Sequence, residues 1–415
     1  MSSVKDITLA PTGERKIKWA QRNMPLLRDI MAEFEKSKPF AGLKIALSIH
    51  MEAKTAFLCR VLAAGGAEMH VTGCNPLSTQ DDVAAAVAAG GIDVHAWHGA
   101  TEEEYHTHLI SVLKAEPNII IDDGGDLLSL VHSEYTHLIP NIIGGCEETT
   151  TGITRLNSMH AAGALRFPMI AVNNARCKYL FDNRYGTGQS VWDGINRTTN
   201  LVVAGKTIVI AGYGWCGKGI AMRAKGFGAK IIICEIDPVK ALEASMDGFD
   251  VKPMAEAATI GDLFITSTGC RDVITSAHFC KMKDGALMCN AGHFNVEIDI
   301  VYLDQNVVSK SQPKPNITGY ELQNGNTVFL LAEGRLVNLA SGDGHPVEIM
   351  DMSFAIQALS AKYLADNRNN IPIDVIPVPE EIDLDVAMRK LRSSGISIDT
   401  LTEMQRKYLD SWDLH

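Results

Sequence analysis

The sequence lacks several features that mark particular classes of protein. No stretch among its 415 residues approaches the roughly 18 apolar residues of a membrane span. The polar opening MSSVKDITLAPTGERK contains no apolar signal core. The formal net charge is −11 and no basic block occurs, which argues against nucleic acid or an anionic membrane as a partner. We therefore expect a cytoplasmic protein that binds neither.

Paired cysteines are also missing. The nine cysteines are an odd number, and none of them forms a CxxC motif. We interpret them as buried free thiols in a reducing compartment, and we expect no metal site. Fixed-period repeats and low-complexity segments are absent as well. A composition of 46% hydrophobic and 21% charged residues is typical of a globular chain, here long enough for two or three domains.

From Gly42 onward, strand-like and helix-like segments alternate. An amphipathic segment over 14–36, interrupted near Pro25, precedes them and is expected to be helical. The expected strands are 43–49, 68–72, 93–96 and 118–121, and the expected helices are 53–64, 81–89 and 102–114. This alternation predicts an α/β fold with a doubly wound parallel sheet.

Polar residues follow several of these strands. His50, Asn75 and Asp123 stand where ligands of open α/β sheets bind, beyond the carboxyl ends of the strands. The alternative is that such residues cap the next helix, which suits Ser78 or Asp81 better than His50. We therefore expect part of a site at this edge of the sheet.

A second sheet begins at 201, and its first turn carries a glycine motif. Gly212, Gly214 and Gly217 follow the strand 207–210 with the spacing G-x-G-x-x-G. These glycines allow a tight turn, close approach to a pyrophosphate and close helix–strand packing. Glu235 comes 18 positions after Gly217, at the end of the next strand, where a carboxylate accepts ribose hydroxyls and repels a 2′-phosphate. The motif therefore predicts an NAD-binding domain rather than one for NADP.

The remaining segments complete a discontinuous arrangement. Further strands are expected at 263–266, 286–290 and 327–331, and a helix over 346–367 leads back to the first domain. We predict a substrate domain of 1–183 and 346–378, an NAD-binding Rossmann domain of 184–345, and a small C-terminal helical arm of 379–415. The arm is expected to pack on a neighbouring subunit, and a loose tail is the alternative.

Eight motifs resemble one family. In order, they are IHMEAKTA, NPLSTQDD, IDDGGDL, CEETTTG, KYLFDNRYGTGQS, AGYGWCGKG, NAGHFNVEID and LLAEGRLVNLASGDGHP. They resemble those of S-adenosyl-L-homocysteine hydrolases over about residues 40 to 365. Unrelated dehydrogenases share only the glycine-rich turn. The resemblance implies a cytoplasmic homotetramer of the methyl cycle with one NAD held in each subunit.

The resemblance also implies site residues by position. The implied catalytic residues are His50, Asp123, Glu148, Lys178, Asp182 and His293. The implied substrate-binding residues are Glu52, Lys54, Asp123, Glu148, Lys178, Asp182, Asp343 and His345. The residues implied to hold or face NAD are Thr149, Thr150, Thr151, Asn183, Gly212, Tyr213, Gly214, Trp215, Cys216, Gly217, Glu235, Lys240, Thr268, Asn290, Ala291, Gly292, His293, Asn338 and His345.

The implied reaction explains why acids and bases gather there. In such enzymes NAD+ oxidises the 3′-hydroxyl, which acidifies C4′–H; the C5′ thiol is then eliminated, water adds, and the ketone is reduced again. Lys178 and Asp182, one helical turn apart, are placed to share O3′–H, with a neutral or hydrogen-bonded Lys178 as base. Asp123 and His50 serve C4′ and C5′, and Glu148 anchors O2′ and O3′.

Departures from the family's better-known members concern the purine and the C-terminus. Glu52 and Lys54 replace a Thr and a Glu, and Asp343 replaces a Met. A Lys only donates hydrogen bonds, which suits the 6-oxo group of hypoxanthine and favours S-inosyl-L-homocysteine, as in a subgroup from methanogens and thermophiles. The alternative is that Lys54 pairs with Glu52 or Asp343 and the substrate is S-adenosyl-L-homocysteine. The usual KPDHYRY ending is also missing, which is expected to weaken or reshape NAD retention.

Two other functions were weighed. An ordinary NAD-linked dehydrogenase would release NADH, and an inactive ligand-sensing relative would lack part of the ribose-facing set. That set, Asp123, Glu148, Lys178, Asp182 and His293, is complete here. The sequence therefore predicts a nucleosyl-homocysteine hydrolase.

Overall fold

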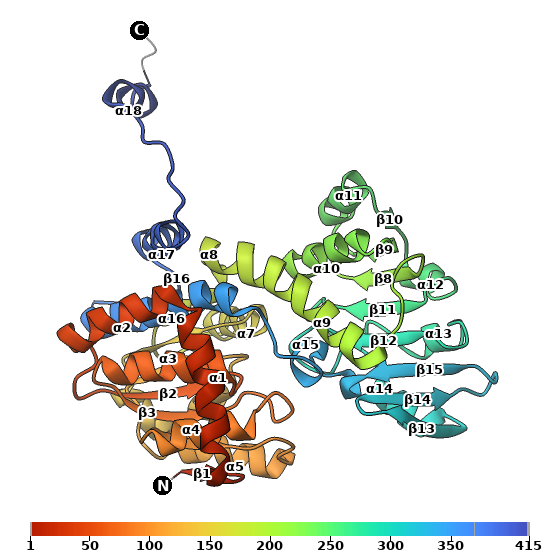
Figure 1. Ribbon diagram of the computed structural model, residues 1–415, viewed down its shortest axis with the longest axis horizontal. Coiled ribbons are helices and arrows are strands. Elements are labelled where there is room, and N and C mark those ends of the chain that lie inside the picture. Colours follow the sequence, from red (N-terminus) through yellow and green to blue (C-terminus); the bar gives the residue numbers. More distant parts are fainter. Residues whose placement is uncertain (1, 369, 413–415) are drawn as a thin grey trace.

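The computed structural model describes residues 2–368 and 370–412 and contains two lobes, each built on one β-sheet (Figure 1). The first sheet has eight strands, all parallel. Their spatial order is β1 (Ser3–Val4), β4 (Asp93–Ala96), β3 (Glu68–Thr72), β2 (Lys44–Ser48), β5 (Ile119–Asp122), β6 (Gly144–Glu147), β7 (Met169–Ala171) and β16 (Val375–Pro377). The four strands expected in this region are confirmed, whereas β6, β7 and β16 were not predicted, because their short runs carry no clear periodicity.

Helices cover both faces of this sheet. One layer comprises α1 (Ala10–Arg22), α2 (Pro25–Ser37), α3 (Ala53–Ala64), α4 (Asp81–Ala89) and α16 (Val347–Asp366). The other comprises α5 (Glu102–Leu113), α6 (Asp126–Ser133) and α7 (Thr150–Ala161), with the short turns η1 (Ile7–Leu9), η2 (Thr136–Asn141) and η3 (Val172–Asn174) elsewhere in the lobe. The predicted break near Pro25 is confirmed, since α2 starts at this proline.

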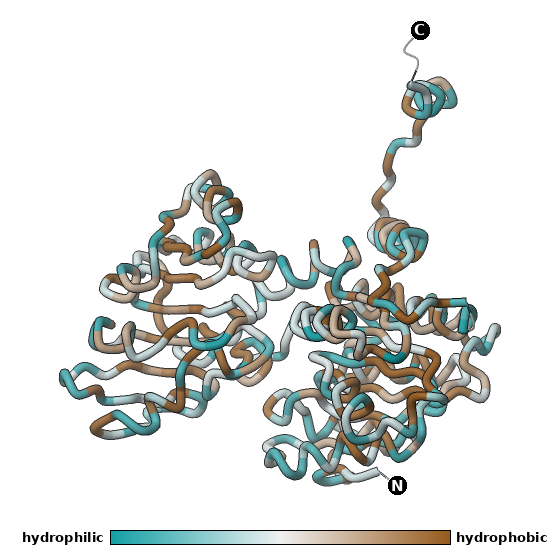
Figure 2. Tube along the Cα trace, turned by 180° about the vertical axis from the view of Figure 1, so that it is seen from behind, coloured by the Kyte–Doolittle hydropathy of each residue, from teal (hydrophilic) through white to brown (hydrophobic). Residues whose placement is uncertain are grey.

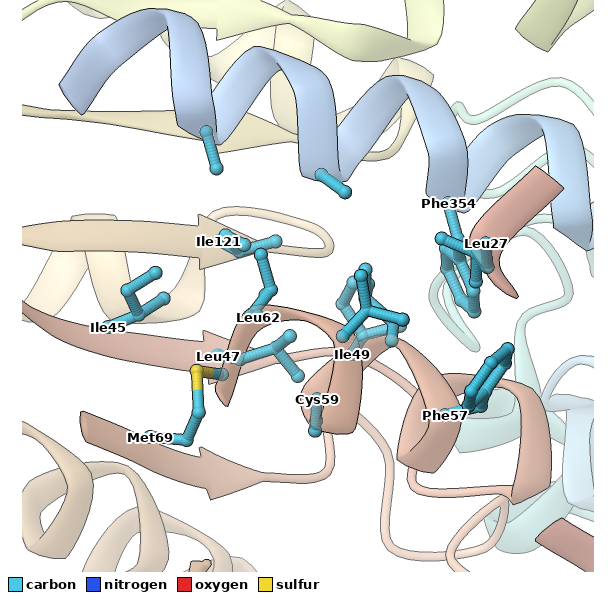
Figure 3. Packing of buried hydrophobic residues seen from close by; sticks show 14 of the residues in the cluster. Leu27, Ile45, Leu47, Ile49, Phe57, Cys59, Leu62, Met69, Ile121 and Phe354 are labelled. Atoms are coloured by element: carbon cyan, nitrogen blue, oxygen red, sulfur yellow. The ribbon is translucent and has the colours of Figure 1, made fainter. Parts of the chain in front are cut away.

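The core of the first lobe follows from the alternation of side chains along a strand. Ile45 and Leu47 point to one face of β2, where they lie with Ile121 of β5 near Leu62 of α3 (Figure 3). Phe354 of α16 closes the same cluster. Because both faces are buried, the strands are continuous apolar runs, as expected for a parallel sheet.

The second sheet is parallel except at one edge. Its spatial order is β10 (Asp250–Val251), β9 (Lys230–Cys234), β8 (Thr207–Ala211), β11 (Leu263–Thr266), β12 (Leu287–Asn290), β15 (Thr327–Leu331), β14 (Ile317–Glu321) and β13 (Ser309–Lys314). The antiparallel hairpin β13–β14 was not predicted. The helical segments are α10 (Trp215–Gly226), α11 (Pro238–Met246), α12 (Met254–Ala257), α13 (Ser276–Phe279), α14 (Ile300–Asn306), η5 (Ala332–Gly334) and α15 (Val337–Ala340).

The chain crosses between the lobes along a nearly continuous helix. It consists of α8 (Arg176–Lys178), a π-helical stretch η4 (Tyr179–Gly186) and α9 (Thr187–Thr199). Helix α16 returns the chain to the first lobe, as predicted (Figure 1). The predicted domain limits stay predictions. None of the helices in the described part of the chain is long and apolar enough to cross a membrane.

The C-terminal arm contains two helices that differ in their contacts. Helix α17 (Glu380–Ser393) packs on the first lobe, where Arg389 Nη1 lies 2.6 Å from Glu33 Oε1. Helix α18 (Glu403–Asp410) stands away from both lobes, with apolar residues along the segment leading to it (Figure 2). Met404, Tyr408 and Leu409 are exposed there. Residues 413–415 of the predicted arm lie outside the described residues.

Candidate active site

A cavity of about 2010 Å³ lies between the lobes, beyond the carboxyl ends of both sheets. Of the predicted residues, it is lined by His50, Glu52, Lys54, Asp123, Glu148, Thr149, Thr150, Thr151, Lys178, Asp182, Asn183, Gly212, Tyr213, Gly214, Trp215, Cys216, Glu235, Lys240, Thr268, Ala291, Gly292, His293, Asn338 and His345. Gly217, Asn290 and Asp343 are not among its lining residues, and the structure places each of them in a supporting position instead.

The glycine motif has the geometry of a dinucleotide turn. Gly212 has a φ of +94°, which disfavours any residue with a side chain. A Cβ on Gly217 would lie 2.0 Å from the carbonyl oxygen of Gly212, so this glycine serves helix–strand packing. A Cβ on Gly214 would meet no protein atom within 4 Å, and no side chain caps helix α10 there. Its free N–H groups therefore suit a pyrophosphate at the helix N-terminus.

Two buried side chains behind this turn hold the neighbouring loops. Asn290 donates from Nδ2 to the carbonyl oxygen of Phe294 at 2.8 Å and accepts from the N–H of Gly292 at 2.7 Å. Glu297 accepts from the N–H of Thr268 at 2.9 Å. Both ends of the Asn290 amide are used in these loop contacts, and its place among the residues that hold or face NAD stays a prediction. Glu297 was not predicted, since nothing in its local sequence marks it.

Lys178 lies at the centre of the ribose-facing set. Its Nζ is 3.3 Å from Asp182 Oδ2 and 3.5 Å from Glu148 Oε1, and it donates to Asn183 Oδ1 at 2.9 Å and Asn173 Oδ1 at 3.2 Å. Asp182 and Asn183 belong to the π-helical stretch that follows Lys178, and such stretches are frequent at functional sites.

The charges of this set are interdependent. Burial alone would lower the pKa of Lys178, but Asp182 and Glu148 outweigh burial and raise that pKa above its usual value. Burial would raise the pKa of Asp182, yet the Lys178 ammonium and His345 hold it well below its usual range. Burial raises the pKa of Glu148 to about 7, despite Lys178. Lys178 is therefore an ammonium, so the neutral form considered from the sequence is disfavoured, and Glu148 is poised to exchange a proton near neutral pH.

Helix α16 supplies partners that the sequence alone did not single out. Ser353 Oγ donates to Asp182 Oδ2 at 2.7 Å, and Gln357 Nε2 donates to Glu148 Oε2 at 2.6 Å. His345, just before this helix, contacts Asp182 through Nδ1. The two α16 residues are one helical turn apart and bind carboxylates that line one cavity, but this becomes visible only when the helix returns to the first lobe.

Replacing Gln357 by Leu is expected to move one limb of the pH profile. The Gln357 amide stabilises the charged form of Glu148, so its loss raises the pKa of that carboxyl further. A lost hydrogen bond to a charged group shifts the pKa by about one unit. The limb of kcat/KM that reports Glu148 ionisation should move to higher pH by that amount. Ser360→Ala, in the same helix, should leave the limb in place, and an equal shift in both variants would contradict the role of Gln357.

His50 and Asp123 form the other half of the polar floor. His50 Nε2 is 3.5 Å from Asp123 Oδ2, and His293 Nδ1 from the second lobe is 3.7 Å from Asp123 Oδ1. Burial lowers the pKa of His50 to about 4, so its ring is neutral. Cys74 donates from Sγ to Asp123 Oδ2 at 3.2 Å. Its place was not predicted, because the cysteines gave no spacing signal.

At the expected purine end, Lys54 is buried beside two oxygen acceptors. Its Nζ lies 3.0 Å from Glu52 Oε2 and donates to the backbone oxygen of Asp343 at 2.9 Å. Glu52 also caps helix α3 by accepting from the N–H groups of Lys54 and Thr55. The Asp343 residue lines a smaller neighbouring cavity of about 500 Å³, so its contribution to the main site is its backbone oxygen.

Arg155 of α7 links the two lobes at the mouth of the site. Its guanidinium carbon lies 4.6 Å from the ring centre of Phe294, next to His293. Arg155 Nη1 donates to the carbonyl oxygen of Gly124 at 2.8 Å and pairs with Asp126 at 3.2 Å. The cation–π contact with Phe294 and the two polar contacts of Arg155 hold the loop after β12 close to the loop after β5.

Replacing Arg155 by Leu is expected to lower kcat/KM about 3- to 10-fold, because about 1 kcal/mol of inter-lobe contact is lost at this half-exposed site. Arg155→Lys keeps the charge but not the planar stacking group, and should recover only part of the loss. Steady-state kinetics tests this, with Ser158→Ala on the exposed part of α7 as control. An Arg155→Leu enzyme with wild-type kinetics would contradict the role.

Comparison with known proteins agrees with this geometry. Residues 183–344 match the S-adenosyl-L-homocysteine hydrolase NAD binding domain, and residues 1–136 match S-adenosyl-L-homocysteine hydrolase. The chain is 56% identical over 412 residues to S-inosyl-L-homocysteine hydrolase of Methanococcus maripaludis, covering 99% of each. It is 57% identical over 410 residues to adenosylhomocysteinase of Thermococcus kodakarensis, covering 99% of this chain and 97% of that protein.

Similarity to solved structures is lower. The NAD+-bound 3-phosphoglycerate dehydrogenase of Entamoeba histolytica matches with a TM-score of 0.45 at 13% identity, over 81% of this chain and 99% of that chain, which is too distant for an argument. The matched NAD-binding domain identifies NAD as the cofactor. The chain is therefore an NAD-binding hydrolase and belongs to the S-adenosyl-L-homocysteine hydrolase family.

Proposed function

We propose that the protein hydrolyses S-inosyl-L-homocysteine reversibly to L-homocysteine and inosine, as a step of the methyl cycle. Family membership supports cleavage of a nucleosyl-homocysteine. The purine preference is inferred from Lys54 and Glu52. S-adenosyl-L-homocysteine, giving adenosine, is the second candidate, and the relatives named above include one protein named for each substrate.

Lys54 pairs with Glu52 and with the Asp343 backbone oxygen, as the adenosyl alternative supposes, so the inosyl preference rests on the one N–H donor of Lys54 that this pairing leaves over. An ammonium has three N–H donors, and two of those of Lys54 meet Glu52 and the Asp343 backbone oxygen. The third is available to a purine. Both oxygens of Glu52 are engaged with Lys54 or the helix N-terminus. A 6-oxo group would accept from the third N–H of Lys54, whereas a 6-amino group donates and cannot accept from that ammonium.

The residues of the cavity then divide the proton transfers of the reaction. NAD held in this cavity would supply reversible hydride chemistry at C3′. Glu148, with a pKa of about 7, is best matched to take the O3′ proton, and the Lys178 ammonium stabilises the charge that develops on O3′. Asp123 and His50 serve C4′ and the sulfur at C5′. His293, from the other lobe, orients the homocysteine end and helps to exclude water.

The test is synthesis in the reverse direction. Purified holoenzyme is incubated with homocysteine and either inosine or adenosine. Thioether formation and the release of free NADH are both measured. Faster synthesis with inosine supports the proposal. Synthesis with adenosine alone would refute the inosyl preference, and stoichiometric release of NADH without thioether would indicate a dehydrogenase.

We also propose a homotetramer in the cytoplasm. The nine cysteines are all free, which suits a reducing compartment. The exposed Met404, Tyr408 and Leu409 of α18 suit burial against another subunit. Sedimentation analysis of the full chain tests the assembly, and a monomer at micromolar concentration would contradict it.

A further inference from the structure

Three side chains of different chemistry meet at the edge of the cavity, which two of them, His50 and Asp123, line. His50 follows β2, Cys74 follows β3 and Asp123 follows β5, which are neighbouring strands in the order β3–β2–β5. One donor atom from each side chain, a ring nitrogen, a thiol sulfur and a carboxylate oxygen, lies within 4.8 Å of the other two. These three ligands come from separate strand ends. The spacing of the cysteines along the chain therefore gives no sign of them and predicts no metal site.

The His50 ring is held in a metal-binding orientation by its neighbours. Ser78 Oγ lies 2.9 Å from the backbone oxygen of Asn75 and 2.6 Å from His50 Nδ1. In the tautomer in which the hydroxyl donates to Asn75 and accepts the Nδ1–H of the ring, the lone pair of His50 is on Nε2, which lies 3.5 Å from Asp123 Oδ2. Metal-bound histidines show the same arrangement, with the far nitrogen donating to a fixed acceptor.

Asp123 presents a buried carboxylate at this place, and His293 Nδ1 lies 3.7 Å from its Oδ1. Asp123 is 2% exposed, and its Oδ1 has no hydrogen-bond partner among the described residues. Its Oδ2 faces the Cys74 sulfur at 3.2 Å and His50 Nε2 at 3.5 Å. Ligands of a tetrahedral zinc ion lie roughly 3.3 to 3.6 Å apart, since zinc bonds to N, O and S are about 2.0 to 2.3 Å long. Two of the three separations are thus close to those of a zinc site.

We propose that His50, Cys74 and Asp123 form an inhibitory binding site for a thiophilic divalent cation, Zn²⁺ in particular. A mixed N, O and S set favours zinc over Mg²⁺ or Ca²⁺, which require oxygen ligands. On binding, the Cys74 thiol releases its proton to the solvent and the thiolate binds the ion. The fourth position opens to the cavity. The ion binds His50 and Asp123, the two groups assigned to C4′ and C5′. The inhibition therefore rests on the proposed function, whereas the binding of the ion does not.

Cobalt is the probe that reports binding without activity. Chelator-treated holoenzyme is titrated with Co²⁺ in the absence of substrate. The expected result is one ion per chain with a thiolate-to-cobalt charge-transfer absorption, which Zn²⁺ removes and Mg²⁺ does not. Cys74→Ser should abolish the absorption, while Cys280→Ser, at an exposed thiol outside the cavity, should retain it. No thiolate absorption in the wild type, or one that survives in Cys74→Ser, overturns the proposal.

Inhibition is measured separately on the same samples. Zn²⁺ should inhibit the wild-type and Cys280→Ser enzymes at concentrations at least about tenfold below those needed for Cys74→Ser, because one of three protein ligands is lost. If Cys74→Ser is poorly folded by circular dichroism, Cys74→Ala takes its place. Equal Zn²⁺ sensitivity of the folded Cys74 variant and the wild type overturns the inhibitory role. If cobalt binds as expected but the enzyme does not hydrolyse a nucleosyl-homocysteine, the proposed function is contradicted and the metal site is not.

Discussion

Replacing Lys178 by Met is expected to slow the formation of enzyme-bound NADH by on the order of 10³-fold. This rate is followed by the NADH absorbance that appears after nucleoside is added. The ammonium lies between Asp182 and Glu148, and its loss removes the positive charge beside O3′. It also leaves two buried carboxylates facing each other, which raises the pKa of Glu148 above about 7 and makes it a weaker proton acceptor at neutral pH. Single-turnover absorbance at matched NAD content measures the effect.

Two variants separate this role from a general loss of structure. Lys310→Met removes an exposed lysine that pairs with Asp304, away from the cavity, and should leave reduction unchanged. Lys178→Arg keeps the charge and is expected to recover part of the rate, although the guanidinium does not match the positions of Asn173 and Asn183. Unchanged reduction of NAD+ in Lys178→Met would refute the role assigned to this residue.

Replacing Lys54 by Met should lower thioether synthesis from inosine about 10- to 100-fold, the equivalent of one lost hydrogen bond to a charged group. Met has nearly the same length but no donor, so the 6-oxo group is left unpaired. Synthesis from adenosine should fall much less, because its amino group does not accept from Lys54. The measurement is the ratio of kcat/KM for the two nucleosides.

The paired Glu52 provides the matched control for this prediction. Glu52→Gln keeps one of the two oxygens that cap helix α3 and removes the charge, so Lys54 stays in the cavity with one partner weakened. The preference for inosine should persist in this variant. An equal loss with both nucleosides in Lys54→Met would show that Lys54 supports the fold of this region rather than selecting the purine.

The strands and the dinucleotide turn could be predicted because their signals are local. Strands β3, β11 and β15 begin and end as expected, since apolar runs bounded by turn residues specify a buried parallel strand. Gly212 and Gly217 could be assigned because each is needed by backbone geometry within a few residues. The hairpin β13–β14 was missed, because Ser309–Lys314 is exposed and has no apolar alternation to reveal it.

Lys178 and Asp182 lie one helical turn apart, so the residue types and the order of the motifs were enough to place them in one site and to identify the family. The protonation of that site depends on contacts between segments far apart in the chain. Burial raises the pKa of Glu148 to about 7. Lys178 and Gln357 lower this pKa and Asp182 raises it, and Gln357 is 209 residues away in the chain. Burial and opposing charges act through space, so only the packing of α16 and of the strand ends specifies which group holds a proton.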